Sequence, residues 1–330
     1  MRPTLPSVQV LRQAHPQRSP IRARLLGRSR DGTTGLMLLQ LAQRLAEQLS
    51  PGPRRGLRLR SLIEKGRPAA LRAVAGQHGP DIEGTPRWVG SDHPEMLVAG
   101  HSHRFAFIDY FNRSNEAAPI AILHGESDID SEASPYWAMV LSAARHDRLP
   151  VAIIWNGNQH NAHFLLEPAA RFSVFPATGP WEDGLSRPLV PRSLIRAFME
   201  PSLVGLRSLL AGIEGVKVAV LGTPPPKSDE AVRAAIETDP WLTDWARDRG
   251  MTMATLRVTP FSVRCELWRV IQELLQEISD AYRVPFVPVP DRMFRDGALS
   301  IEASAPDATH ANGVWAETMT RAAMSAVRTQ

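Results

Sequence analysis

The sequence predicts an α/β fold, a three-layer α/β/α sandwich around a five-stranded parallel sheet, preceded by a basic, helical N-terminal extension. Two observations predict it. Five short apolar runs lack the alternation of a half-exposed strand, and amphipathic helical stretches separate several of them. Runs of this kind are typical of strands buried on both faces, which parallel sheets have when helices cover each side.

The five predicted strands end on glycine, proline or polar residues. They are "EMLVAG" at 95–100, "PIAILHGESD" at 119–128, "LPVAIIWNGNQHN" at 149–161, "VKVAVLGTPPP" at 216–226 and "VPFVPVP" at 284–290. Helical segments are predicted at 192–213 and 262–282, and in the second one Leu267, Ile271 and Leu274 recur on one face. In open parallel sheets the chemistry lies at the carboxyl ends of the strands. The polar clusters after the first three strands should therefore meet at one edge.

The chain is expected to divide into a basic, partly disordered and helical extension over 1–90 and a catalytic domain over 91–330. Residues 1–75 carry 15 Lys and Arg against three acidic residues, a net charge of +12. Because the whole chain has a net charge of +4, the remaining residues carry −8. Leucines at helical spacing over Leu38–Leu49 predict an amphipathic helix. This charge distribution favours a polyanion or a partner protein as a ligand of residues 1–75.

Composition excludes several classes of protein. Cys265 is the single cysteine, so neither an intrachain disulfide nor a cysteine-based metal site is expected. No uncharged apolar stretch of about 18 residues is present, which argues against a transmembrane segment. The arginine-rich N-terminus lacks the apolar core of a secretory signal, and we expect a cytoplasmic protein.

Reactive side chains follow the predicted strands. Gly100, His101 and Ser102 follow the first strand, Gly125 ends the second, and Asn156–Asn161 follows the third. Near the C-terminus, "DATHANG" places Asp307 three residues before His310, ahead of a final helix. Asp and His at this spacing can pair, and a histidine held by a carboxylate can take a proton from a serine hydroxyl.

The order of these blocks resembles the SGNH hydrolases, also called the GDSL esterase/lipase superfamily. That family has a serine after strand one, a glycine after strand two, an asparagine block after strand three and an Asp-x-x-His pair before the last helix. The resemblance covers 95–330 and implies a flavodoxin-like sheet. It also implies a nucleophile at Ser102, a general base at His310 and an orienting carboxylate at Asp307.

The resemblance also implies an oxyanion hole built from Ser102 N–H, Gly125 N–H and the Asn158 amide, with Asn161 and Gln159 as fallbacks. Two positions depart from the family pattern. His101 stands where the family commonly has Asp, and Gln159 stands two residues after Gly157 where the pattern has Asn.

Four further residues are predicted to lie in the pocket: His101, His103, Trp155 and His160. The segments at 167–215 and 224–250 are expected to shape the substrate site.

The predicted function is a serine-dependent O-acyl or acetyl esterase that acts on a small-molecule or glycan ester and needs no cofactor. An O-acyltransferase of the same fold shares the first half-reaction. "GHSH" and "GNQH" also resemble blocks of calcineurin-type metallophosphoesterases, whose imidazoles hold metals, although the block order here is reversed. A non-catalytic binding protein on a degenerate hydrolase fold is the remaining alternative.

Overall fold

The computed structural model describes 86–115, 117–125, 129–156, 158–167, 171–176, 187–238, 256–330 and the single residues 243, 247 and 252. The predicted N-terminal extension, including the Leu38–Leu49 helix, lies outside these residues up to Thr85. Contacts within the chain divide it into units at Met1–Ser50 and Pro51–Gln330, and the second unit holds all the elements below.

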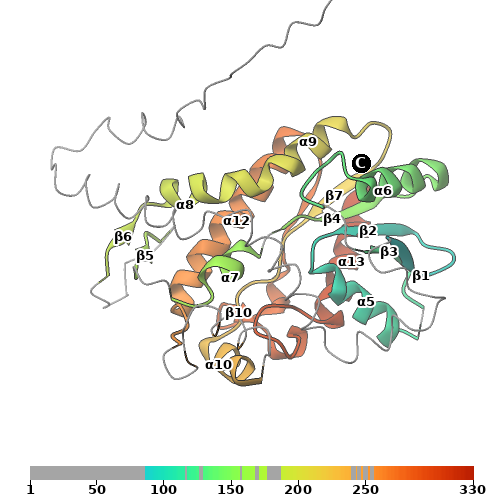
Figure 1. Cartoon of the computed structure of the whole chain (residues 1–330). Helices are drawn as coiled ribbons and strands as arrows, with labels where there is room; N and C mark the ends of the chain where they lie inside the picture. Colours follow the sequence, from blue (N-terminus) through green and yellow to red (C-terminus); the bar gives the residue numbers. More distant parts are fainter. Residues whose placement is uncertain are drawn as a thin grey trace, which may run out of the picture. The chain divides into compact units, whose positions relative to one another are not determined.

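A six-stranded sheet forms the centre of the described unit, in the order β1-β3-β2-β4-β7-β8 (Figure 1). Five of these strands are parallel and correspond to the five predicted runs. Their bounds are Met96–Gly100 (β2), Ile120–His124 (β3), Val151–Ile154 (β4), Val218–Leu221 (β7) and Phe286–Val287 (β8). The predicted three-layer α/β architecture is therefore confirmed.

The sixth strand, β1 (Arg87–Gly90), is absent from the sequence prediction. It pairs antiparallel with β3, with Trp88 opposite Leu123. The sheet therefore begins at Arg87, inside the range assigned to the extension. The four residues of β1 lie between stretches rich in Gly, Pro and Asp, and their apolar pattern is too short to be distinguished from a linker.

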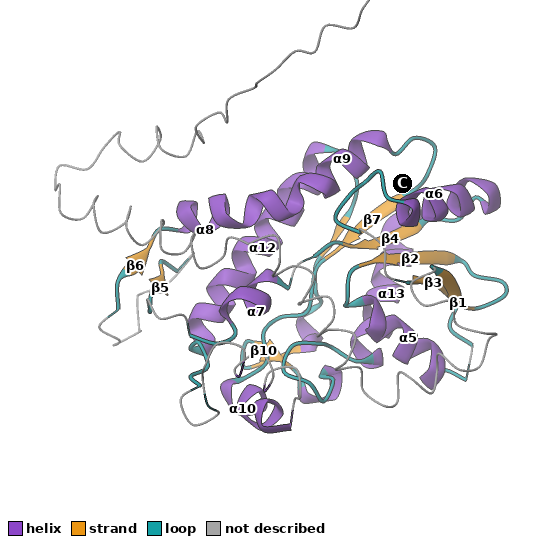
Figure 2. Ribbon diagram, viewed as in Figure 1, coloured by secondary structure: helices purple, strands orange, loops and turns teal. Residues whose placement is uncertain are grey.

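Helices cover both faces of the sheet (Figure 2). Helices α5 and α13 pack on each other against one face, and α6, α9 and α12 lie on the other side, as right-handed crossovers require. The helix bounds are Arg104–Arg113 (α5), Pro135–Asp147 (α6), Gln159–Phe164 (α7), Arg192–Met199 (α8), Val204–Gly212 (α9), Asp229–Thr238 (α10), Phe261–Ala281 (α12) and Gly313–Arg328 (α13). The predicted helix at 192–213 is divided by a 3-10 turn at Glu200–Leu203, where Pro201 cannot continue an α-helix.

Short elements complete the described unit. They are two-residue strands at Ser173–Val174 (β5), Leu189–Val190 (β6), Phe294–Arg295 (β9) and Ala298–Leu299 (β10), and 3-10 turns at Asp291–Met293 and Ile301–Ala303. The core lies on both sides of the central strands: Val98 and Ile122 pack toward α5 and α13, and strand neighbours such as Leu97 and Ile153 are equally buried. None of the helices in the described residues is long and apolar enough to cross a membrane.

Candidate active site

The strand order places three reactive loops side by side at the carboxyl edge of the sheet. Strand β2 lies between β3 and β4, so the turn with Ser102 is flanked by Gly125 on one side and by the loop after β4, which carries Asn156 and Asn158, on the other. The strand register also places the loops after β2 and β4 at the same edge, because Gly100 at the end of β2 is opposite Ile154 at the end of β4. These are the three blocks that the sequence places at one edge.

Glycine is required where β2 turns toward Ser102. Gly100 has φ +135°, and a Cβ atom there would lie 1.9 Å from the carbonyl oxygen of Ile154. His101 N–H then donates to the same carbonyl at 3.0 Å. Ser102 follows on a turn that leads into α5 and is partly exposed. The chain thus leaves β2 sharply and presents Ser102 at the edge of the sheet.

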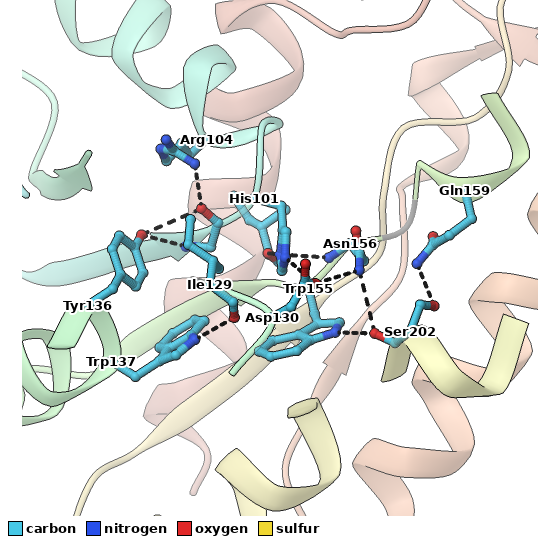
Figure 3. A network of polar contacts seen from close by, with 12 residues as sticks. His101, Arg104, Ile129, Asp130, Tyr136, Trp137, Trp155, Asn156, Gln159 and Ser202 are labelled. Atoms are coloured by element: carbon cyan, nitrogen blue, oxygen red, sulfur yellow. Dashed lines mark hydrogen bonds and ion pairs between the residues drawn. The ribbon is translucent and has the colours of Figure 1, made fainter. Parts of the chain in front are cut away.

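Two buried side chains fix the strand ends that flank this turn. The Arg104 guanidinium donates to the carbonyls of Gly100 and Gly125, each at 2.9 Å. The Tyr136 hydroxyl accepts from Gly100 N–H at 2.8 Å (Figure 3). It also donates to the Leu123 carbonyl at 3.0 Å. The ends of β2 and β3 are therefore linked twice by side chains that cannot move without losing buried hydrogen bonds.

Asp307 and His310, which the sequence predicts to pair, are in hydrogen-bond contact. His310 Nδ1 lies 3.2 Å from Asp307 Oδ2, and Asp307 Oδ1 accepts from the backbone N–H groups of Thr309 and His310, both at 2.7 Å. Because the carboxylate accepts at Nδ1, that nitrogen carries the hydrogen and Nε2 keeps its lone pair. Within the part of the chain that the structure covers, His310 Nε2 is buried and has no hydrogen-bond partner.

The loop that carries this pair is held from both ends. Lys227 is buried and donates to the carbonyls of Ala305 and Asp307, at 2.6 and 2.5 Å. Asn312 caps α13 by accepting from Val314 N–H at 2.9 Å, and Asp109 of α5 accepts from Gly313 N–H at 2.6 Å. The position of His310 is therefore set by α5, α13 and the segment before α10.

Asp307 is kept ionised by its surroundings. Burial alone would raise its pKa, but the nearby imidazole of His310 and its hydrogen bond, the charge of Lys227 and the Thr309 N–H outweigh burial and hold the pKa of Asp307 well below its usual range. An ionised carboxylate at Nδ1 stabilises the imidazolium that forms when Nε2 takes a proton.

The turn of Ser102 meets the His310 loop through His103. The rings of His103 and His310 are 5.3 Å apart between centroids in an edge-to-face arrangement, and the Trp315 ring lies 6.3 Å from that of His103. Burial is the largest of the effects that lower the pKa of His103 well below the ordinary value, and the neighbouring His310 adds to it. Among the described residues no hydrogen bond joins Ser102 Oγ to His310.

Among the described residues, the three expected oxyanion donors meet no internal acceptor. The N–H groups of Ser102 and Gly125 donate no hydrogen bond to any residue that the structure places. Asn158 is partly exposed, and its side-chain oxygen accepts from Asn161 Nδ2 at 2.7 Å, which leaves its amide hydrogens without an acceptor in the same set of residues. The fallback residues Asn161 and Gln159 are buried, and each donates to a neighbour, Asn158 and Ser202.

The four predicted pocket residues have different environments. Trp155 is fully buried, its ring stacks on that of Trp137 with 5.7 Å between the centroids, and its indole N–H donates to the Ser202 carbonyl. Its side chain therefore belongs to the core instead of lining a pocket. His103 and His160 are also buried, while the His101 side chain is partly exposed and bonded to Asp130. Across the described ranges, no group of three His, Cys, Asp or Glu side chains is arranged to hold a metal ion.

Sequence reasoning missed the residues that position the site: Arg104, Tyr136, Lys227 and Asp130. Each acts through a partner that is distant in sequence, as in the Tyr136–Gly100 bond across 36 residues and the Lys227–Asp307 bond across 80. A lone Arg or Lys in a single sequence gives no signal of this kind. The one clue in the sequence is that Arg104 lies two residues after Ser102, where the turn ends.

No protein-family model matches the chain, and no curated protein sequence matches it. Among solved structures, it is similar to a protein named as an acylhydrolase from Bacteroides fragilis, with 14% identity, a TM-score of 0.34, 79% of this chain and 95% of that one covered. It is also similar to a GDSL-like lipase from Bacteroides thetaiotaomicron, with 12% identity, a TM-score of 0.32, and 71% of this chain and 88% of that one covered. A carbohydrate acetylesterase from Sinorhizobium meliloti is similar as well, with 16% identity, a TM-score of 0.32, and 72% of this chain and 97% of that one covered. Likenesses this distant carry no argument about activity.

Proposed function

We propose that the chain is a serine-dependent ester hydrolase of the SGNH type, with Ser102 as nucleophile, His310 as general base and Asp307 as its orienting carboxylate. One observation carries the proposal. His310 Nδ1 is held by Asp307, and Nε2 is buried without a partner among the described residues, on a loop that contacts the Ser102 turn through His103. A base with this tautomer is ready to accept the proton of a serine hydroxyl.

The reaction follows from these groups. Ser102 Oγ attacks the ester carbonyl carbon while its proton passes to His310 Nε2, and the carbonyl oxygen becomes an oxyanion. Ser102 N–H, Gly125 N–H and the Asn158 amide supply donors for it, all three without an internal acceptor in the described residues. Collapse of the intermediate breaks the bond to the alcohol oxygen, which takes the proton from Nε2.

Water then completes the cycle. It attacks the acyl-Ser102 carbonyl, gives a proton to His310 Nε2, and the second collapse returns this proton to Ser102 Oγ and releases the carboxylic acid. A hydroxyl-bearing acceptor in place of water would make the same site an O-acyltransferase. The substrate class that we propose is a small-molecule or glycan ester, and the proposed chemistry uses no cofactor.

Labelling with a fluorophosphonate tests the assignment. Wild type should gain one adduct by intact mass, and Ser102→Ala should gain none. Ser131→Ala is the matched control, because Ser131 lies on the loop before α6 and is also partly exposed; it should label as wild type does. Labelling that persists in a folded Ser102→Ala protein would refute the nucleophile.

A further inference from the structure

A second set of polar contacts lies beside the Ser102 turn and continues into the β4 loop (Figure 3). Asn156 N–H donates to His101 Nδ1 at 2.9 Å, and His101 Nε2 lies 3.0 Å from Asp130 Oδ1. Asn156 Nδ2 donates to the same carboxylate oxygen at 3.0 Å. We call His101, Asp130 and Asn156 the loop brace. Since His101 Nδ1 accepts, its Nε2 must carry the hydrogen that Asp130 receives.

The brace holds a backbone conformation that an asparagine adopts at a cost. Asn156 has φ +38°, in the left-handed region that non-glycine residues rarely occupy. Such conformations persist where the surroundings fix them. Here the backbone N–H and the side-chain amide of Asn156 are both bound by the brace, so the chain direction after β4 is set two residues before Asn158.

Ser202 anchors the same loop at further points, and Asn156 Nδ2 also donates to its carbonyl, at 3.4 Å. Gln159 Nε2 donates to Ser202 Oγ at 2.8 Å, and the Trp155 indole N–H donates to the Ser202 carbonyl at 3.0 Å. Ser202 in turn donates to the Met199 carbonyl at 2.7 Å. Asn158 therefore lies between two fixed points, the brace at Asn156 and the Ser202 contacts at Gln159.

We infer that His101 and Asp130 are positioning residues that set the orientation of the Asn158 amide toward the oxyanion. The inference rests on the proposed function. Donors to an oxyanion act only when they are in place before the charge develops, and a small displacement removes most of their effect. His101 links this role to the nucleophile, because it immediately precedes Ser102 and is bonded at its ring to the loop that carries Asn158.

Asp130 is the residue at which positioning can be separated from stability. Its side chain is 70% exposed, so the hydrogen bond that it accepts from His101 contributes little to the free energy of folding. Asp130→Ala removes the acceptor of two of the three brace hydrogen bonds, those donated by His101 Nε2 and Asn156 Nδ2. Asp130→Asn keeps a carbonyl oxygen that can accept both, and Glu132→Ala removes the same charge from an exposed residue of the same loop.

The test measures the second-order rate constant of Ser102 labelling by a fluorophosphonate in the full chain, with kcat and KM on p-nitrophenyl acetate and thermal midpoints. Asp130→Ala should slow labelling roughly 10-fold to 100-fold, a part of the roughly 10²–10³-fold effect of one lost oxyanion donor. The loss should appear in kcat, with KM and the thermal midpoint close to wild type. Asp130→Asn and Glu132→Ala should stay within about threefold, because neither removes the acceptor.

A double-mutant cycle with Asn158→Ala gives the deciding result. If Asp130 acts through Asn158, adding Asp130→Ala to Asn158→Ala should cost almost nothing further. Additive effects, or a wild-type labelling rate for Asp130→Ala, would overturn the brace while leaving the nucleophile intact. If wild type itself gains no adduct, the proposed function fails and the brace fails with it.

Discussion

At the scale of single residues, Asn158 is the sharpest test of the oxyanion hole. Its oxygen is bound by Asn161 and its amide hydrogens have no acceptor in the described chain. Asn158→Ala should therefore lower kcat for ester hydrolysis roughly 10²–10³-fold with an unchanged thermal midpoint. Steady-state kinetics on p-nitrophenyl acetate measure this.

Asn161→Ala is the matched control, since it removes a side-chain amide from α7, the short helix that begins directly after Asn158. Asn161 only orients Asn158, so its loss should cost less than the loss of the donor itself. If Asn158→Ala retains wild-type activity while Asn161→Ala is severely impaired, the oxyanion donor lies three residues further along the chain.

His103 should make stability depend on pH. Its pKa in the folded chain is lowered, by burial first, so the unfolded chain binds a proton at higher pH than the folded one. The free energy of unfolding should then fall as pH drops below about 6.5, by up to about 1.4 kcal/mol per pH unit for this one group. Urea unfolding between pH 7 and 5 measures how steeply the free energy of unfolding falls with pH, and this fall should be less steep for His103→Leu. Equal slopes for the two proteins would refute this role.

At the scale of elements, the turn from β2 to α5 depends on Gly100. Gly100→Ala should destabilise the chain by more than about 2 kcal/mol, because a Cβ would lie 1.9 Å from the Ile154 carbonyl at a φ that only glycine adopts readily. Gly212, at the end of α9, has a normal φ, and a Cβ there would meet no atom within 4 Å. Gly212→Ala should be neutral or slightly stabilising. Denaturant unfolding measures both variants, and an equal loss of unfolding free energy in Gly100→Ala and Gly212→Ala would contradict the clash of a Cβ at Gly100 with the Ile154 carbonyl.

The parallel strands could be predicted because each is a continuous apolar run ended by glycine, proline or polar residues. Strand β1 could not, since Arg87–Gly90 depends on its pairing with β3 rather than on its own pattern. The Asp307–His310 pair was predictable because both residues lie within one turn of chain. The brace and the Arg104 and Lys227 contacts were not, because their partners come from distant segments that only the fold brings together.

At the scale of the whole molecule, all proposed catalytic groups lie beyond Gly100, while the basic charge is concentrated in residues 1–75. A truncated chain that begins at Gly84 should keep the kcat/KM of the full chain on a small soluble ester. It should lose affinity for polyanions, and that affinity in the full chain should fall steeply with salt. Kinetics and polyanion binding at two ionic strengths measure both. A truncated protein that is folded yet inactive would show that the residues before Gly84 complete the site.

In the proposed mechanism, an acyl group passes through Ser102 with His310 as the base. Acid-quenched mass spectrometry of the reaction with p-nitrophenyl acetate, followed by peptide mapping, tests it most directly. One acetyl group is expected on the peptide that contains Ser102, formed in wild type and absent when His310→Gln removes the base. An active protein that carries no acetyl group at Ser102, or carries it on another residue, would contradict this mechanism.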